Sequence, residues 1–261
     1  EKRAGHLGTL DPAAAGVLPI CFGRATRLFD LLVDKDKEYV FEIAFGVKTD
    51  TQDAFGKVLA RDSRVVSAEQ VRSVLPSLTG IQDQAASIYS ALKIDGKKMY
   101  ELARAGEDVE PKTRSVQIDA LELLLQTGEN RFLLRAVCSR GTYIRSLCES
   151  IAERLDTIAY MPFLLRTRSG PFTIEQALSI GELESSKQEG TLERAVISCE
   201  QAVSFLPEVL LPEDRKTPAR NGLETNLKGL PAGYCRLYAG KEFLGVGLAE
   251  KGCVKLRIHL Y

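Results

Sequence analysis

One glycine-rich stretch near the start of the chain does most to constrain its fold. Residues 5–16 hold three glycines and a single carboxylate, Asp11, which Pro12 follows directly. Glycine adopts backbone angles that a Cβ forbids, and proline pushes the residue before it into an extended conformation. These residue types suit an ordinary surface turn, or a stiff loop that aims a carboxylate at a substrate. Composition by itself favours the turn.

Length and composition exclude several classes of protein. The chain has 261 residues, of which 44% are apolar, so it can bury the core of one large domain or of a main domain with a small second one. Its six cysteines form no CxxC pair and it has only two histidines, which argues against a metal site and favours a reducing, cytoplasmic setting. No run approaches the roughly 20 apolar residues of a membrane span, so no membrane segment is expected.

Charge is balanced over the whole chain, with 35 basic and 35 acidic residues. A polyanionic partner would therefore need basic side chains that are gathered locally. Residues 130–148 contain four arginines and no acid, and residues 93–104 contain four basic residues diluted by two acids. Each stretch fits an ordinary solvated face as well as a phosphate-binding surface, and the residues alone do not decide between the two.

Hydrophobic periodicity predicts the main elements of the first two thirds of the chain. Alternating apolar residues predict a strand over residues 37–45, and a second, buried strand is expected over residues 131–138. Ser67 and Gln70 form a capping box, which predicts a helix that runs to about residue 78. The alternation of strands, turns and helices favours a mixed fold.

The basic residue Arg145 stands out by its place in a predicted helix. Apolar residues from Ile144 to Leu155 recur at helical spacing, with Thr142 as the N-cap, so Arg145 lies in the first turn. The helix dipole disfavours a cation there, at a cost of a few tenths of a kcal/mol for an exposed side chain. A charge at such a position often has a specific anionic partner. Arg145 is therefore either a tolerated surface arginine or one half of an ion pair.

The last part of the chain has a different pattern. A polar stretch around residues 185–190 predicts a connection between two parts of the protein. From residue 199 the sequence indicates short strands and turns, including an Asn221-Gly222 turn, which is typical of a small β module.

The glycine-rich stretch has a second interpretation when the residues up to Arg27 are included. Residues 5–27 have the sequence GHLGTLDPAAAGVLPICFGRATR, which resembles the signature of the TruB-type tRNA pseudouridine synthases. That family modifies the uridine at position 55 in the T loop of tRNA. Four further segments resemble the family's motifs and follow in the family's order: GVKTDTQDAFG at 46–56, YSALKIDGKKMYELARAG at 89–106, CSRGTYIR at 138–145 and LLRTRSGPF at 164–172.

The resemblance implies a set of catalytic and RNA-binding residues. Asp11 would be the nucleophile, Arg145 would pair with it and orient it, and Tyr39 would stack on the base and take part in moving the C5 proton. His6 would help the protein insert into the T loop. Residues of about 82–114 would form a thumb that closes over the RNA. The remaining residues that we expect to bind substrate RNA are Tyr89, Lys93, Lys97, Arg140, Tyr143 and Leu164, the last of which would line the uracil pocket.

The resemblance also implies an α+β fold: a pseudouridine-synthase core with a mixed, largely antiparallel sheet over residues 1–185, and a small PUA-like β domain over residues 199–261. The reaction breaks the N1–C1′ bond, turns the uracil while it stays bound, and joins C5 to C1′. It involves no redox change, so no cofactor is expected. The partner would be the T stem-loop of tRNA, read by flipping the target base out of the loop. The protein is expected to act as a monomer, without an obligate protein partner or a membrane.

Two alternatives stay open at this point. One is a guide-RNA-dependent relative that shares the aspartate motif, and the other is a non-catalytic tRNA-binding or tRNA-folding chaperone. The chain departs from the family at three places: it begins without the strand and helix that precede the glycine loop, it has Leu7 where many relatives carry a small hydroxyl residue, and it has Ala85-Ala86 where relatives carry prolines. None of these departures removes Asp11.

Overall fold

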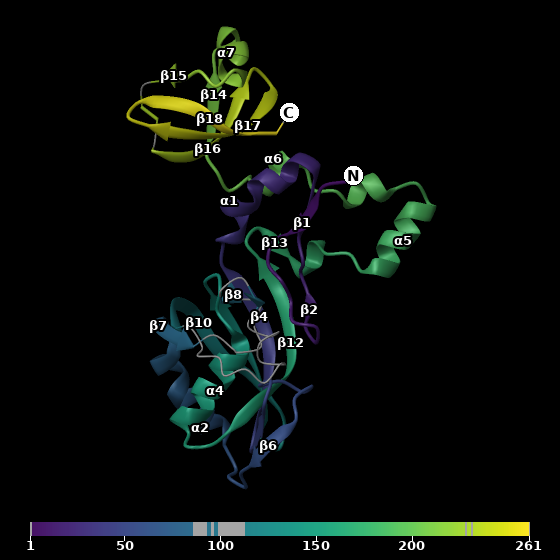
Figure 1. Cartoon of the computed structure of the whole chain (residues 1–261), viewed down its shortest axis with the longest axis vertical. Helices are drawn as coiled ribbons and strands as arrows, with labels where there is room; N and C mark the ends of the chain where they lie inside the picture. Colours follow the sequence, from purple (N-terminus) through teal and green to yellow (C-terminus); the bar gives the residue numbers. More distant parts are fainter. Residues whose placement is uncertain are drawn as a thin grey trace. The chain divides into compact units, whose positions relative to one another are not determined.

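The computed structural model describes residues 2–85, 93–94, 97–98, 113–227, 229–230 and 232–260, with the backbone alone for the two short pieces between 93 and 98. The chain divides into two compact units. We call Leu10–Val17 with Asp34–Gly170 the sheet unit, and Glu1–Thr9, Leu18–Val33 and Pro171–Tyr261 the terminal unit. Figure 1 shows the elements of both units with their labels. The assignment of residues 1–185 and 199–261 to two functional domains stays a prediction.

The sheet unit is built on a twisted sheet of antiparallel neighbours. Its strands follow the order β12 (Ala159–Ser169), β4 (Lys37–Phe45), β11 (Arg131–Cys138), β10 (Thr113–Gly128) and β7 (Gly80–Ala85). A two-residue strand, β2 (Ala15–Gly16), pairs in parallel with β12. The mixed, largely antiparallel sheet expected from the sequence is confirmed, and β4 and β11 have the predicted bounds.

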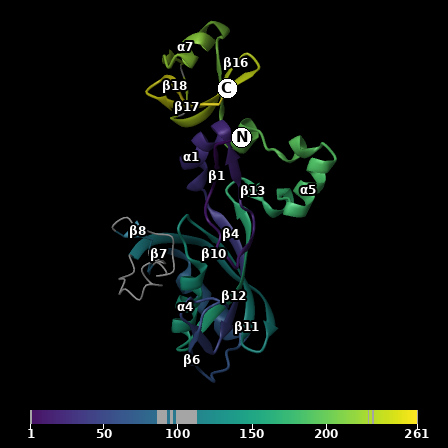
Figure 2. The ribbon, with the colours of Figure 1, turned by 45° about the vertical axis from the view of Figure 1, so that its right-hand side comes forward.

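One face of this sheet carries the hydrophobic core. Alternate residues of β4 point into it, and they pack with α2 (Ala68–Val74), η2 (Leu75–Leu78) and α4 (Ile144–Arg154). Figure 1 shows α2 and α4 beside the sheet, and Figure 2 shows α4 there from another direction. The predicted capping box is present, since the Ser67 and Gln70 side chains each accept a hydrogen bond from the other's backbone. A strand with one buried face has apolar residues at every second position, and a helix packed against it has them about every 3.6 positions. The hydrophobic period of the sequence therefore changes between these elements.

A short hairpin of β5 (Val47–Thr49) and β6 (Val58–Arg61) carries the hydroxyl- and carboxylate-rich turn. Its carboxylates hold the turn together: Asp50 Oδ1 accepts from Lys57 N at 2.8 Å, and Asp53 Oδ1 accepts from Thr51 Oγ1 at 2.6 Å and from Phe55 N at 3.0 Å.

In the terminal unit, β1 (Ala4–His6) pairs with β3 (Ile20–Phe22), and η1 (Gly23–Leu28) leads into α1 (Phe29–Val33). Leu7 lies in the core of this unit with an exposed fraction of 1%, packed with residues that include Leu28, Leu32 and Val203. A leucine at this position therefore stabilises the fold by burying apolar surface.

The next part of the terminal unit differs from the sequence prediction. After β13 (Phe172–Thr173) and η3 (Ile174–Gln176) come α5 (Ile180–Gln188), η4 (Leu192–Ala195) and α6 (Cys199–Ala202). The polar stretch around residues 185–190 was expected to be a connection, but its first residues belong to α5. That helix starts with a Ser179–Glu182 capping box and buries none of its residues, so its sequence lacks an apolar face that periodicity could detect.

The C-terminal part of this unit is a small β module, as expected. The elements are β14 (Glu208–Leu211), η5 (Glu213–Arg215), α7 (Lys216–Arg220), β15 (Thr225–Asn226), β16 (Gly233–Ala239), β17 (Glu242–Glu250) and β18 (Cys253–His259). They form one sheet in the order β14-β16-β17-β18-β15. Asn221 and Gly222 end helix α7 and do not form a hairpin turn. The PUA-like identity of this module stays a prediction.

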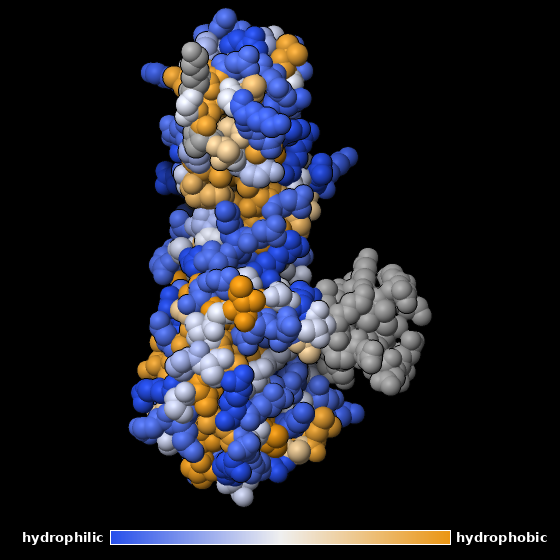
Figure 3. Space-filling model, turned by 90° about the vertical axis from the view of Figure 1, so that its left-hand side faces the viewer, coloured by the Kyte–Doolittle hydropathy of each residue, from blue (hydrophilic) through white to orange (hydrophobic). Residues whose placement is uncertain are grey.

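Two observations concern the surface. None of the helices in the described ranges is long and apolar enough to cross a membrane. On the face shown in Figure 3, hydrophobic residues are scattered among hydrophilic ones, which is ordinary for exposed apolar side chains.

Candidate active site

The sheet unit brings Asp11 and Arg145 into direct contact. Arg145 Nε lies 2.9 Å from Asp11 Oδ2, and Arg145 Nη2 donates to Asp11 Oδ1 at 3.3 Å, so the guanidinium holds both carboxylate oxygens. The arginine side chain is 4% exposed and the aspartate side chain 33%. Arg145 Nη1 also donates to Thr51 O at 3.1 Å. A two-point contact of this kind fixes the plane of a carboxylate as well as its position, while the exposure leaves the carboxylate accessible.

The backbone around Asp11 is tied to the edge of the sheet. Ala14 N donates to Asp11 O at 2.9 Å, which closes a turn, and Val17 N donates to Arg166 O at 2.8 Å at the far end of the loop. Between them Gly16 has a φ of +105°, and a Cβ built there would lie 2.2 Å from Arg166 O. Only glycine fits this close approach between loop and strand. The glycine-rich stretch is therefore a stiff loop that presents Asp11.

Arg145 is the second residue of α4, in the first turn, as the sequence predicts. The predicted N-cap is wrong: Thr142 Oγ1 donates to Ser139 O at 3.0 Å, and the N-cap position belongs to Tyr143. The Tyr143 side chain does not cap α4, but Gln84 of β7 holds this N-cap residue in place, because its Oε1 accepts from Tyr143 N at 2.7 Å and its Nε2 donates to Tyr143 O at 3.0 Å. The cation near the positive end of the helix has the expected anionic partner in Asp11.

Tyr39 lies on β4 opposite Arg166 of β12 and is 9% exposed. Burial raises the pKa of its phenol above the ordinary value, while the Arg166 guanidinium opposes that rise and the Asp11 charge adds to it. Leu164 is 7% exposed, pairs with Phe41 and belongs to the same hydrophobic core as Tyr39. An aromatic ring and an apolar side chain of one cluster are residue types that can pack against a flat base.

Two further predicted substrate-binding residues have partners within the sheet unit. Arg140 forms an ion pair with Asp34, and its side chain is 53% exposed. The Tyr143 ring is half-buried, and the Arg114 guanidinium carbon lies 5.3 Å from its centroid. Both side chains can still reach a ligand, but the charge of Arg140 is partly countered.

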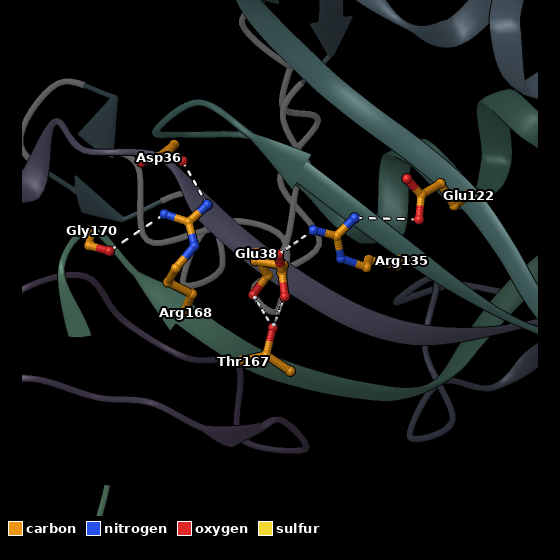
Figure 4. Close-up of polar contacts among 7 residues, drawn as sticks. All are labelled: Asp36, Glu38, Glu122, Arg135, Thr167, Arg168 and Gly170. Carbon is orange, nitrogen blue, oxygen red and sulfur yellow. Dashed lines mark hydrogen bonds and ion pairs between the residues drawn. The ribbon is translucent and has the colours of Figure 1, made fainter. Parts of the chain in front are cut away.

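The other arginines of residues 130–148 are countered as well. Arg131 Nη2 lies 2.8 Å from Glu42 Oε2, and Arg135 lies 2.6 Å from Glu38 and 3.3 Å from Glu122. Figure 4 shows the network around Arg135, which Thr167 joins through Glu38. The hydrogen bond from Arg135 holds the pKa of Glu38 below its usual value. Acids from neighbouring strands thus neutralise a stretch that contains no acid of its own, which favours the solvated-face interpretation for Arg131 and Arg135.

The remaining predicted residues fall elsewhere in the chain. His6 is exposed at the end of β1 in the terminal unit, opposite Ile20. Tyr89 lies outside the described residues. Lys93 and Lys97 belong to β8 (Lys93–Ile94) and β9 (Lys97–Lys98), whose backbones pair as a small antiparallel hairpin.

Three residues near the site were not singled out by the sequence: Gln84, Lys37 and Arg166. Lys37 is 5% exposed, and burial lowers the pKa of its amine to about 8, assisted by the charges of Arg166 and Arg140. The period of two in β4 places Lys37 on the face of Tyr39, so this signal was available. Gln84 and Arg166 act through contacts with distant segments, and no local pattern marks them.

Metal-binding side chains do not gather in the described part of the chain: no group of three or more His, Cys, Asp or Glu residues there could hold a metal ion.

The sequence matches known families over most of its length. Residues 1–144 match the profile of the TruB family pseudouridylate synthase N-terminal domain, and residues 145–214 match that of the tRNA pseudouridylate synthase B C-terminal domain. The tRNA pseudouridine synthase B of Pelotomaculum thermopropionicum is 42% identical over 245 residues, which cover 92% of this chain and 78% of that protein. The protein of the same name from Bacillus cereus is 42% identical over 230 residues, or 85% of this chain and 75% of that protein.

Solved structures agree in fold. The chain aligns over its whole length with 77% of a chain in an H/ACA RNP bound to a substrate RNA containing 2′-deoxyuridine, with a TM-score of 0.75 and 24% identity. It aligns equally with 77% of a chain in a Cbf5-Nop10-Gar1 complex, with a TM-score of 0.73 and 26% identity. The domain matches and the relatives at 42% identity establish that the chain belongs to the TruB family of pseudouridylate synthases, a family of isomerases.

Proposed function

We propose that this chain converts the uridine at position 55, in the T loop of tRNA, into pseudouridine. The observation that carries the proposal is the contact between Asp11 and Arg145, made by two segments that are 134 residues apart in the chain and resemble two motifs of the family. The relatives at 42% identity are named tRNA pseudouridine synthase B, which supports tRNA as the substrate.

In the proposed reaction, Asp11 is the nucleophile and Arg145 orients it. The two hydrogen bonds from the guanidinium hold the carboxylate plane, so that one oxygen can face the bound nucleotide. The target uridine leaves the loop stack, its ring packs against Tyr39 and Leu164, and the uracil turns before C5 joins C1′. The N1–C1′ bond breaks before the uracil turns, and after C5 has joined C1′ the C5 proton leaves while N1 takes up a proton, so the product is an isomer of the substrate. We assign to the Tyr39 hydroxyl a part in moving the C5 proton.

We assign substrate binding to the residues predicted from the sequence. His6, Tyr89, Lys93, Lys97, Arg140 and Tyr143 are proposed to contact the RNA. The proposal also includes a monomeric enzyme that acts in the cytoplasm without a cofactor, an obligate protein partner or a guide RNA.

A test with minimal components separates this proposal from its alternatives. The purified chain is incubated with a T stem-loop RNA alone, and pseudouridine is mapped by nucleotide. The proposal predicts one pseudouridine, at the position equivalent to 55, and none in an RNA with cytidine there. Product that appears only after a guide RNA and accessory proteins are added would identify a guide-dependent enzyme. Tight tRNA binding with no product at high protein concentration would favour a chaperone.

A further inference from the structure

Arg166 is a charged side chain with an exposed fraction of only 1%, and it is among the largest fully buried side chains in the described part of the protein. It lies on β12 between the Asp11 loop and β4. A bulge follows it, because Arg166 pairs with Tyr39 while Arg168 pairs with Glu38. The two arginines of the segment thereby have different neighbours: Arg168 binds Asp36 at 2.6 Å, as Figure 4 shows, and Arg166 lies opposite Tyr39.

On one side, Arg166 is joined to the Asp11 loop. Its Nε donates to Val17 O at 2.7 Å, and its carbonyl oxygen accepts from Val17 N at 2.8 Å. The same residue pairs with Gly16 in the β2–β12 ladder, at the point where no Cβ fits. Side chain and backbone of Arg166 thus bind the same end of the loop.

On the other side, Arg166 acts on the Tyr39 hydroxyl. Arg166 and Tyr39 are directly opposite each other on neighbouring antiparallel strands, so their side chains lie side by side on one face of the sheet. The Arg166 guanidinium opposes the effect of burial on the pKa of the Tyr39 phenol. The charges of Cys138 and Asp11 disfavour the phenolate. Of these three groups, Arg166 is the one that favours the charged form.

We propose that Arg166 is a positioning residue whose single guanidinium holds the Asp11 loop at Val17 and the hydroxyl of Tyr39, and so keeps the carboxylate and the hydroxyl in a fixed relation. This role rests on the proposed function, in which the uracil turns between the Asp11 carboxylate and the Tyr39 hydroxyl. A planar guanidinium suits the task, since its donors diverge in fixed directions and its charge persists at any working pH. A lysine keeps the charge but has one donor group on a flexible stem.

The test uses Arg166→Met and Arg166→Lys, with Arg168→Met as the matched control on the same strand. A fluorinated tyrosine, whose phenol ionises at lower pH, is incorporated at position 39 and titrated by ¹⁹F NMR without RNA. Removing the cation in Arg166→Met should raise the titration midpoint by about one to three pH units, while Arg166→Lys and Arg168→Met shift it much less. An unchanged midpoint in Arg166→Met, or an equal shift in Arg168→Met, would overturn the proposal.

Kinetics supply the second readout. Both Arg166 variants should slow single-turnover pseudouridine formation by about 100-fold while the Kd for tRNA stays within about twofold, and Arg168→Met should keep the rate of the unmodified protein. A rate in Arg166→Lys equal to that of the unmodified protein would contradict a positioning role for the planar group. Because the titration needs no RNA, a midpoint shift in a protein that makes no pseudouridine would refute the proposed function and leave the Arg166 contact standing. Arg166→Lys keeps the test usable if Arg166→Met does not fold.

Discussion

At the residue scale, the site depends on groups that are held in unfavourable surroundings by their neighbours. Arg145 is almost fully buried, and its two-point contact with Asp11 offsets the cost of removing its charge from water. Lys37 and Arg166 are buried cations of the same unit, and the charge of Arg166 helps to lower the pKa of the Lys37 amine. Such arrangements are rarely selected for stability, because apolar residues of the same size would usually do as well. Their presence beside Tyr39 supports a functional reason.

Replacing Gly16 with alanine tests the close approach of the Asp11 loop to β12. The added Cβ would meet Arg166 O at 2.2 Å and would sit at a φ of +105°, so the loop has to move. We expect a loss of about 1–3 kcal/mol in the free energy of unfolding and a clear loss of activity. Urea unfolding and single-turnover assays measure the two effects. Gly128→Ala, whose Cβ would make only ordinary contacts, is the control, and an equal loss in both variants would argue against the steric explanation.

Replacing Lys37 with methionine tests the cost of its burial. The pKa of Lys37 is about 8 in the folded protein and near 10.5 in the unfolded chain. Between pH 8 and about 10.5 Lys37 is protonated in the unfolded chain but mostly neutral in the folded protein. The free energy of unfolding therefore rises with pH over this range. Lys37→Met should be more stable than the unmodified protein by up to about 3 kcal/mol at pH 7, and the difference should vanish as the pH rises from 8 to about 10.5. Urea unfolding across that range measures it, and a difference that does not change with pH would refute the assignment.

At the scale of elements, α4 positions Arg145 and the Asp11 loop positions the carboxylate. The loop is pinned by β12, and the start of α4 is pinned by Gln84 from β7. Gln84 is 6% exposed and binds both backbone groups of Tyr143, two residues before Arg145. The start of the helix that carries Arg145 is thus held by a residue that lies 59 positions before Tyr143 in the chain.

Gln84→Leu should therefore affect catalysis as well as stability. Loss of the two hydrogen bonds leaves Tyr143 N without this partner, while Tyr143 O still accepts from Leu147 N at 3.1 Å, and the change should cost about 1–2 kcal/mol. The displaced helix start should slow pseudouridine formation about tenfold or more. Thr142→Ala is the matched comparison, and it should cost about 0.5 kcal/mol with little change in rate. A larger loss of free energy of unfolding in Thr142→Ala than in Gln84→Leu would contradict this prediction and favour Thr142 as the N-cap.

The elements also show how far the sequence could predict the structure. Periodicity gave β4 and β11 with their bounds, and the Ser67–Gln70 capping box gave α2, because these signals are local. The sequence did not predict which residue precedes α4, because Gln84, which holds that residue, is distant in the chain. It did not predict the extent of α5, because that helix has no buried face. The arginines of residues 130–148 were ambiguous for the same reason: their acidic partners come from other strands.

At the scale of the whole molecule, the chain combines a neutral overall charge with family motifs spread over most of its length. Net charge does not attract RNA here, so binding has to come from local basic groups and from shape. The resemblance of separate motifs predicts Asp11, Tyr39 and Arg145 as site residues. The structure adds that the Asp11–Arg145 contact lies within one compact unit.

The most direct test of the whole account is pseudouridine formation by Asp11→Asn on a T stem-loop RNA. The substitution keeps the shape of the side chain and removes its charge, and Asp36→Asn serves as a control because Asp36 binds Arg168 away from the site. We expect Asp36→Asn to keep the ordinary rate, and Asp11→Asn to lose at least about 10³-fold while it still folds and binds the RNA. Pseudouridine formation by Asp11→Asn at the ordinary rate would contradict the account.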